Sequence, residues 1–252
     1  MQPRPLPLEA ALDALLQDGH ACLGPSHWMK PWGVSPTGMQ ALAQHWCDLP
    51  PDAYLKDGGR YRRRRHACLV SDGRPGSRPQ PVPHRAHWQP LDYNALHGGL
   101  ERWFEPVSPE LAESIDWQAM LTGLAGCATV LRGGLPPSGH WAMEVHQFRI
   151  DTTDGIGRPT PEGAHRDGVD LVAVMLIARE GVKGGETRVF EADGPLGQRF
   201  TLVEPFTLLL LDDARVIHET TPIQPALPGG AGHRDTLVVT CRAAGFQGPD
   251  AP

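Results

Sequence analysis

Residues 161–168 read PEGAHRDG, and within this stretch His165 and Asp167 are separated by a single residue. An imidazole and a carboxylate so close in sequence can both turn toward a hard or borderline divalent metal. A second His-x-Asp tripeptide occurs at residues 233–235, but only the first has a third histidine downstream, His218, that belongs to no such tripeptide. The order of His-x-Asp, several strands and then His predicts a metal site formed by His165, Asp167 and His218.

This ligand set suits one kind of chemistry in particular. Two imidazoles and one carboxylate on one face of an octahedron leave three positions open, and iron(II) needs these to bind a bidentate keto acid and then dioxygen. Zinc can use the same ligands, and a His-x-Asp tripeptide by itself is most often a turn or a surface feature. Residues elsewhere in the sequence therefore have to distinguish an iron site from a zinc site or a surface turn.

The last apolar segment, residues 234–240 (RDTLVVT), supplies a discriminating residue. An inward-pointing guanidinium of Arg234 could clamp the distal carboxylate of a dicarboxylic acid through two charge-assisted hydrogen bonds. Thr236 lies two residues later and therefore on the same strand face. The alternative is an exposed Arg234 paired with Asp213 or Glu219.

Several segments in the same order resemble the bacterial L-isoleucine 4-hydroxylase type of 2-oxoglutarate/Fe(II)-dependent dioxygenase. They are residues 145–150 (VHQFRI), 161–168 (PEGAHRDG), 184–187 (GGET), His218 and 234–237 (RDTL). The resemblance is strongest over residues 140–242. It implies a double-stranded β-helix core of the jelly-roll or cupin-like kind, preceded by a helical portion.

The resemblance also implies cofactors and an activity. Fe(II) would bind His165, Asp167 and His218, and 2-oxoglutarate would bind Arg234, with Thr236 standing where many relatives have a serine. With O2 as oxidant and ascorbate as a helper in vitro, the enzyme would hydroxylate an unactivated C–H bond. The implied substrate is a small molecule, a free aliphatic L-amino acid, and the by-products are succinate and CO2.

Polar partners for such a substrate are expected near the first metal motif. Gln147 and Arg149 share one face of the segment that precedes it, and they are the candidate substrate-binding residues. The same alternation is equally compatible with a solvated face. The loop over residues 72–90, rich in Pro, Gly, Ser and Arg, is expected to border the site.

Two other function classes use the same residues. A cupin-like hydrolase or isomerase would keep the metal triad without an oxidant, and Arg234 argues against it. A non-catalytic regulatory protein would bind 2-oxoglutarate and metal without turnover, and only a turnover measurement separates it from an enzyme.

The periodicity predicts a mainly β protein with a helical N-terminal part, of the α+β class. One domain is expected over residues 1–252, with a helix-rich portion over 1–131 and the β-helix core over 140–242. Helical spacing is expected at 8–16, at 37–48 and in two groups of apolar residues between 93 and 131. Extended segments are expected at 142–150, 171–178, 187–191, 201–203, 207–211 and 236–242.

Composition and charge limit the kinds of partner that the protein is expected to bind. The net charge of −6 disfavours a nucleic-acid binder, and the RYRRRR run at 60–65 predicts a strand with a solvated face. No apolar run predicts a membrane span and the start does not resemble a secretory signal, so the cytoplasm is the default location. A homodimer is compatible with the sequence but not specified by it.

His146 is expected to pack beside the strand that leads to the metal motif. The other histidines are expected to be surface or hydrogen-bonded residues: His20, His27, His45, His66, His84, His87, His97 and His140.

Overall fold

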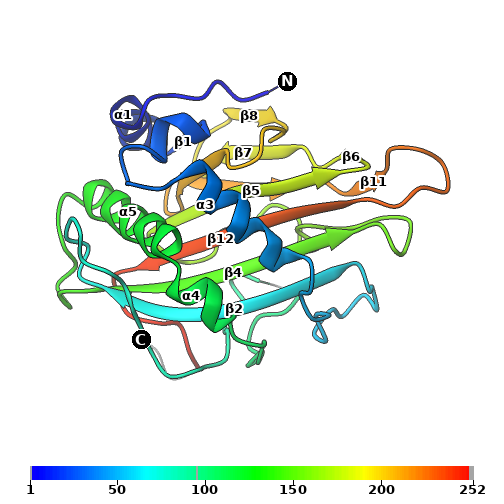
Figure 1. The fold of residues 1–252 in the computed structure, drawn as a ribbon, viewed down its shortest axis with the longest axis horizontal. Coiled ribbons are helices and arrows are strands. Elements are labelled where there is room, and N and C mark those ends of the chain that lie inside the picture. Colours follow the sequence, from blue (N-terminus) through cyan, green and yellow to red (C-terminus); the bar gives the residue numbers. More distant parts are fainter. Residues whose placement is uncertain (1, 95, 250–252) are drawn as a thin grey trace.

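The computed structural model describes residues 2–94 and 96–249 and is mostly β, with helices gathered on one side (Figure 1). The N-terminal half contains most of the helical structure: α1 (Leu8–Asp18), α2 (Pro25–Trp28), α3 (Pro36–Ala43), the 3-10 helix η1 (Gln44–Trp46), α4 (Pro109–Glu113) and α5 (Ile115–Leu131). Prolines begin α2, α3 and α4, where the missing amide hydrogen costs nothing.

A seven-stranded antiparallel sheet forms the body of the molecule. In spatial order its strands are β1 (His20–Leu23), β9 (Leu208–Asp212), β5 (Leu171–Glu180), β12 (His233–Arg242), β4 (Trp141–Asp151), β2 (Arg62–Ser71) and β3 (Gln80–Pro81). Two small antiparallel sheets complete the double-stranded β-helix: β10 (Val216–Thr220), β7 (Thr187–Glu191) and β8 (Gly197–Phe200) in one, and β11 (Ile223–Pro225) with β6 (Val182–Gly184) in the other. The expected fold class is confirmed.

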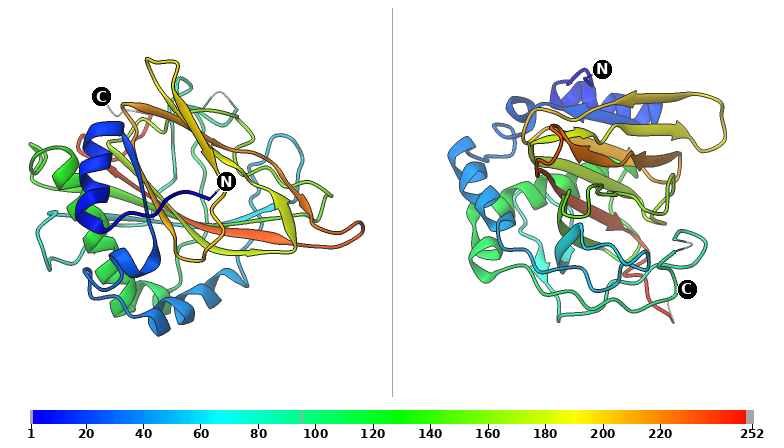
Figure 2. Two further views of the ribbon diagram at one scale, coloured as in Figure 1. Left: turned by 90° about the horizontal axis from the view of Figure 1, so that it is seen from above. Right: turned by 90° about the vertical axis from the view of Figure 1, so that its right-hand side faces the viewer.

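Each face of the large sheet packs against a different layer (Figures 1 and 2). Along β5, Ala173 and Met175 join the core beneath the helices, whereas Val172 and Leu176 join a second core with residues of the β10-β7-β8 sheet. Successive side chains of a strand point to opposite faces, so β5 reads as a nearly continuous apolar run. Toward β2 the second face carries polar side chains, and there it forms the floor of a cavity.

Two expected elements differ from the structure. Residues 201–203 are not a strand, and β8 ends just before them at Phe200. The described residues between 93 and 104 contain no helix, although Leu96, Leu100 and Trp103 have helical spacing; these three side chains are 40–52% exposed. The Gly98-Gly99 pair disfavours a helix because glycine has low helix propensity. The chain also approaches itself closely here, since a Cβ on Gly98 would lie 2.5 Å from the Asn94 carbonyl oxygen.

Among the described residues, no helix has the length and apolar character needed to cross a membrane.

Candidate metal centre and its cavity

The structure brings His165, Asp167 and His218 together. The backbones of His165 and His218 exchange two hydrogen bonds, at 3.0 and 2.9 Å, which join the loop before β5 to strand β10. The two carboxylate oxygens of Asp167 each lie 3.8 Å from one imidazole Nε2, Oδ1 from His165 and Oδ2 from His218. One ligand atom from each residue lies within 4.8 Å of the other two, so the three can share one ion.

The protonation states of these residues suit a divalent metal. Nδ1 of His165 lies 2.9 Å from the carbonyl oxygen of Gly163, which can only accept, so Nδ1 carries the proton and Nε2 is free to coordinate. Burial and the neighbouring His165 hold the pKa of His218 well below its ordinary value, so this ring is neutral. Burial opposes protonation of His165, but the charges of Asp167 and Glu162 raise its pKa, which indicates an anionic centre. Two imidazoles and a carboxylate fit Fe(II), which would displace any proton from Nε2 of His165 on binding.

Asp213 fixes the backbone of the metal loop, the segment over residues 163–170 that carries His165 and Asp167. Its carboxylate accepts hydrogen bonds from the backbone amides of Asp167 at 3.0 Å, Gly168 at 2.7 Å and Val169 at 3.1 Å. Gly168 has a φ of +74°, and a Cβ there would lie 2.6 Å from the ring of Tyr93, so the turn requires glycine. Burial and the charge of Asp167 raise the pKa of Asp213 to about 6. Sequence reasoning considered Asp213 only as a partner of Arg234, and no sequence pattern indicated its contact with the loop that contains His165 and Asp167.

Arg234 lies on β12 with 3% of its surface exposed, and both it and Thr236 line the cavity that contains the triad. Within the described part of the chain, its Nε and Nη2 atoms have no hydrogen-bond partner. Burial and the nearby Arg179 lower its pKa to about 10. An unpaired buried guanidinium is costly, so it fits an absent anionic ligand such as a carboxylate. The surface pairing with Asp213 or Glu219 is not formed, and Glu219 instead lies 3.0 Å from Arg188.

Gln147 and Arg149 are not brought to the site. Gln147 Nε2 donates to the carbonyl oxygen of His45 at 3.1 Å, and Arg149 forms a two-bond ion pair with Asp235 at 2.8 and 2.6 Å. Both side chains leave β4 on the helix side, and the cavity receives Phe148 and Ile150 from the other face. Sequence alternation gave two equivalent faces, and the expected one was wrong.

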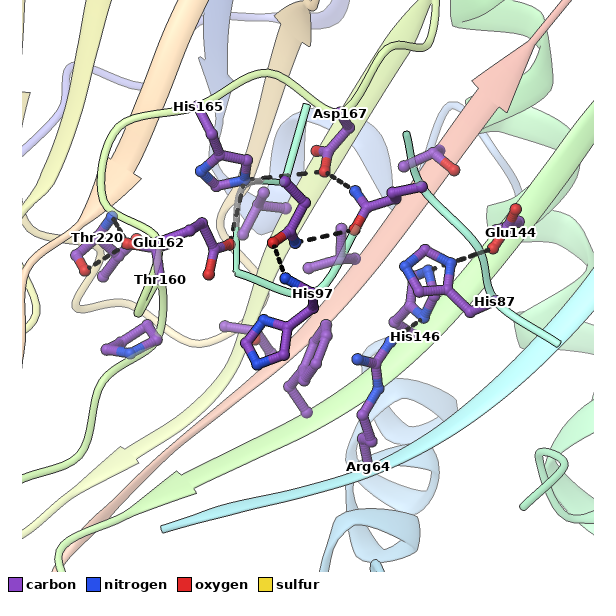
Figure 3. A pocket seen from close by; sticks show the side chains of 18 of the residues that line it. Arg64, His87, His97, Glu144, His146, Thr160, Glu162, His165, Asp167 and Thr220 are labelled. Carbon is purple, nitrogen blue, oxygen red and sulfur yellow. Dashed lines mark hydrogen bonds and ion pairs between the residues drawn. The ribbon is translucent and has the colours of Figure 1, made fainter. Parts of the chain in front are cut away.

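The loop between β3 and α4 closes the cavity and supplies residues that sequence reasoning missed (Figure 3). Gln89 Nε2 donates to Oδ1 of Asp167 at 3.0 Å, and Gln89 Oε1 accepts from Arg102 Nη2 at 2.8 Å and from Asn94 Nδ2 at 3.1 Å. His97 lines the same cavity and is 2% exposed, so it is not a surface residue. The expectation that the 72–90 loop borders the site is confirmed at His87 and Gln89.

The arginine run forms strand β2 as expected, with Arg63 on its solvated face, but the face of Arg62 and Arg64 is buried. Arg62 is 5% and Arg64 is 3% exposed. Arg62 Nε donates to buried Asp52 at 2.7 Å, and the Arg64 guanidinium lies 3.8 Å from the ring centroid of Phe104 and 4.4 Å from that of Phe148. The compensating residues come from distant segments, so a run of charges alone could not predict this burial.

Beside these arginines lies a second group of residues with metal-ligand chemistry: His66, His87, Glu144 and His146. His87 Nδ1 lies 2.6 Å and His66 Nε2 lies 2.9 Å from Glu144 Oε2, while Arg64 Nη2 donates to His146 Nδ1 at 2.7 Å. That donation leaves the proton of a neutral His146 on Nε2, the atom that faces Glu144 at 3.8 Å. A nearby guanidinium also repels a cation, so we interpret this group as a buried hydrogen-bond network.

Burial governs the charges of this network. It lowers the pKa of His87 to about 4, despite the charge of Glu144. Burial opposes ionisation of Glu144, but His87 and His66 outweigh it and hold the pKa of Glu144 far below its ordinary value. At neutral pH the network is therefore a carboxylate that accepts from neutral imidazoles.

Comparisons with known proteins agree with this geometry. The 2OG-Fe dioxygenase family model matches residues 43–240. The crystal structure of a bsmA homolog from Methylobium petroleophilum PM1 is 51% identical, with a TM-score of 0.91 and 98% of both chains covered. Lower-identity likenesses concern the fold: IDO from Bacillus thuringiensis (TM-score 0.72, 16% identity, 96% of this chain and 97% of that one) and the Fe(II)/(alpha)ketoglutarate-dependent dioxygenase TqaL (TM-score 0.71, 19% identity, 97% and 89%). No curated protein matches the chain.

Proposed function

The chain belongs to the 2OG-Fe dioxygenase family, and we propose that it hydroxylates an unactivated C–H bond of a free aliphatic L-amino acid. As a family member it is an oxidoreductase that uses Fe(II), 2-oxoglutarate and O2. The residue roles and the substrate are the proposed part. The resemblance of the metal and arginine motifs to the L-isoleucine 4-hydroxylase type supports this substrate class.

One observation carries the proposal: the His165, Asp167 and His218 cluster and the unpartnered guanidinium of Arg234 line the same cavity. We assign Fe(II) to the three clustered residues and the distal carboxylate of 2-oxoglutarate to Arg234 with Thr236. When bound, iron and 2-oxoglutarate supply the oxidising chemistry with O2, and 2-oxoglutarate leaves as succinate and CO2.

The chain's own residues orient these groups and exclude water. Gln89 and Asp213 fix Asp167 from two sides, one at its carboxylate and one at its backbone amide. Nδ1 of His165 holds its proton against the Gly163 carbonyl, which keeps Nε2 available for the metal. The apolar wall accepts an aliphatic side chain and keeps bulk water from the reacting carbon; its members are Phe148, Ile150, Val169, Val174 and Val238.

Other properties stay predictions. We propose a small-molecule substrate, with no nucleic-acid partner because the chain carries a net charge of −6, and no membrane partner. A single domain over residues 1–252, a cytoplasmic location and homodimer formation also stay predictions.

Succinate formation from 2-oxoglutarate under air, with Fe(II) and ascorbate, tests the proposed function across a panel of free L-amino acids. We expect at least one aliphatic amino acid to stimulate succinate formation in the wild type. We expect Asp167→Ala and Arg234→Ala to abolish that stimulation. An iron-binding wild type that forms no succinate with any amino acid would contradict the proposed substrate class, and would favour another substrate or a regulatory protein.

A further inference from the structure

The cavity contains unsatisfied polar groups that the iron and 2-oxoglutarate assignments do not use. Both ring nitrogens of His97, Nη2 of Arg62 and Nε of Arg102 are buried, and no described residue is their hydrogen-bond partner. The exposed fractions of these side chains are small, at 2% for His97, 5% for Arg62 and 2% for Arg102. Buried donors without partners are rare in folded proteins, so their gathering in one cavity indicates a ligand.

These donors lie apart from Arg234. Arg62 on β2, Ile150 on β4 and Arg234 on β12 form one row across the sheet, each in register with the next. Adjacent strands are about 4.8 Å apart, so the backbones of Arg62 and Arg234 are about 10 Å apart, with the Ile150 side chain between them. A carboxylate held by Arg234 therefore leaves the Arg62 side free for a second anionic group.

The same region of the cavity is lined by three residues that influence one another electrostatically: Arg62, Arg102 and His97. The charge of Arg62 is the largest electrostatic influence that lowers the pKa of both Arg102 and His97, after burial itself. Arg62 is paired with Asp52, whereas a side-chain hydrogen bond of Arg102 goes to the neutral amide of Gln89. Among the described residues no carboxylate forms an ion pair with Arg102, so the carboxylate of a ligand can take that place.

An acceptor of opposite charge faces the same space. Glu162 lines the cavity, and its Oε2 is buried without a partner among the described residues, while its Oε1 lies 3.6 Å from Nε2 of His165. The charge of Glu162 acts on both His97 and Arg102. Figure 3 shows Glu162 beside His165, with His97 on the side away from His165. A ligand between Glu162 and His97 therefore meets a carboxylate that lies beside His165 and the unpartnered ring nitrogens of His97.

We propose that this second subsite binds both charged ends of an α-amino acid, with Glu162 holding the ammonium group and Arg102, Arg62 and His97 holding the carboxylate. The assignment rests on the proposed function and deepens it. It leaves the aliphatic side chain of the substrate to the apolar wall of the cavity. It also sets the recognition rule that an aliphatic acid without the amine, or an amine without the acid, lacks one of two required charges.

Functional-group analogues test this rule. The probes are L-isoleucine with 3-methylpentanoic acid and 2-methylbutylamine, and L-leucine with 4-methylpentanoic acid and 3-methylbutylamine. In the succinate assay, the half-saturating concentration of the amino acid should be at least about tenfold below that of each analogue, because a charge-assisted hydrogen bond is lost. In Glu162→Gln, the preference for the amino acid over the desamino acid should shrink to less than about threefold, through KM more than kcat.

Matched variants separate recognition from folding. Glu101→Gln removes the same charge from an exposed residue next to Arg102 and should keep the wild-type preference. Arg102→Gln should narrow the preference for the amino acid over the amine, and Arg102→Lys should restore part of it. Arg102 is buried, and its replacement can disturb the loop that contains it. The Glu162→Gln variant therefore tests the subsite independently of the Arg102 variants.

The outcomes of the proposed function and of this subsite are distinguishable. A Glu162→Gln variant with the wild-type preference, or a wild type that responds equally to all three probes of a set, overturns the subsite. Succinate formed from 2-oxoglutarate without any response to L-isoleucine or L-leucine also overturns it, while the iron and 2-oxoglutarate assignments stand. No succinate under any condition overturns the proposed function and the subsite together.

Discussion

Gln89 donates a 3.0 Å hydrogen bond from Nε2 to Oδ1 of Asp167, so the long loop after β3 is fastened directly to a candidate metal ligand. The same Gln89 accepts from Arg102 through Oε1. A single amide therefore joins the proposed metal site to the proposed substrate subsite and fixes the orientation of the Asp167 carboxylate.

Removal of this amide should weaken metal binding. Gln89→Leu keeps the approximate side-chain volume but cannot donate to Asp167, and we expect the dissociation constant for Fe(II) to rise by about 10- to 100-fold, as for other groups that orient metal ligands. Anaerobic titration of the full-length protein with Fe(II) measures this change. Gln80→Leu, at an exposed position of β3, is the control. Equal affinities of wild type and Gln89→Leu would show that the hydrogen bond has no orienting role.

Asp213→Asn should loosen the metal loop. The carboxylate accepts from three consecutive backbone amides, and an asparagine side chain offers one oxygen and a competing donor. We expect a loss of unfolding free energy of about 1–3 kcal/mol and weaker Fe(II) binding. Chemical denaturation and metal titration check both, with the exposed Asp193→Asn as control. Unchanged stability would contradict the structural role of Asp213.

Acidification should destabilise the protein through His87. In the unfolded chain His87 gains a proton below about pH 6.5, whereas in the fold its pKa is about 4 because of burial. Between these values the unfolded state binds more protons, so stability is present above about pH 6.5 and is lost as the pH falls toward 4. The loss amounts to at most about 3 kcal/mol.

Denaturation midpoints measured across this pH range test the assignment. In His87→Asn the side-chain amide can still donate to Glu144 but does not titrate, so we expect a shallower dependence on pH. His140→Asn changes an exposed histidine and serves as control. An unaltered slope in His87→Asn would exclude His87 as the titrating group.

Arg149 should matter for stability and not for substrate recognition. Its guanidinium pairs with Asp235, which is 2% exposed. Arg149→Ala leaves this buried carboxylate with only His233, at 3.5 Å, as an ion-pair partner, and should cost about 3–5 kcal/mol. The KM for substrate in the folded fraction should stay at the wild-type value, since the side chain faces the helices. Arg199→Ala, at an exposed position, is the control. A raised KM without loss of stability would contradict this prediction and would indicate that Arg149 binds the substrate.

The sequence predicted the fold class and the elements with strong periodicity. The ordered arrangement of His165, Asp167, His218 and Arg234 also predicted the residues that the structure gathers in one cavity. These positions were recognisable because their motifs are local and their order along the strands is fixed. Successive side chains of a strand point to opposite faces, but this alternation does not say which face meets the helices. Gln147 and Arg149 were therefore assigned to the cavity face, although they lie on the helix face.

The rest of the cavity depends on long-range contacts. Gln89, His97 and Arg102 lie in an irregular loop whose apolar residues have a helical spacing that the structure does not follow. They reach the cavity because Gln89 bonds to Asp167 and Asn94 bonds to Gln89. Arg62 and Arg64 are buried because Asp52 and two aromatic rings cover them. No short-range signal encodes such partners, so a charged run reads as solvated until the fold is known.

Anaerobic titration of Fe(II) followed by 2-oxoglutarate tests the central assignment most directly, because chelation of iron by the keto acid gives a visible absorption band. We expect one Fe(II) per wild-type chain and the band on addition of 2-oxoglutarate, loss of iron binding in His165→Ala and Asp167→Ala, and retained iron with weakened 2-oxoglutarate binding in Arg234→Ala. His233→Ala, in the other His-x-Asp tripeptide, should behave as wild type. Iron binding at wild-type affinity in His165→Ala and Asp167→Ala, or none in the wild type, would contradict the account.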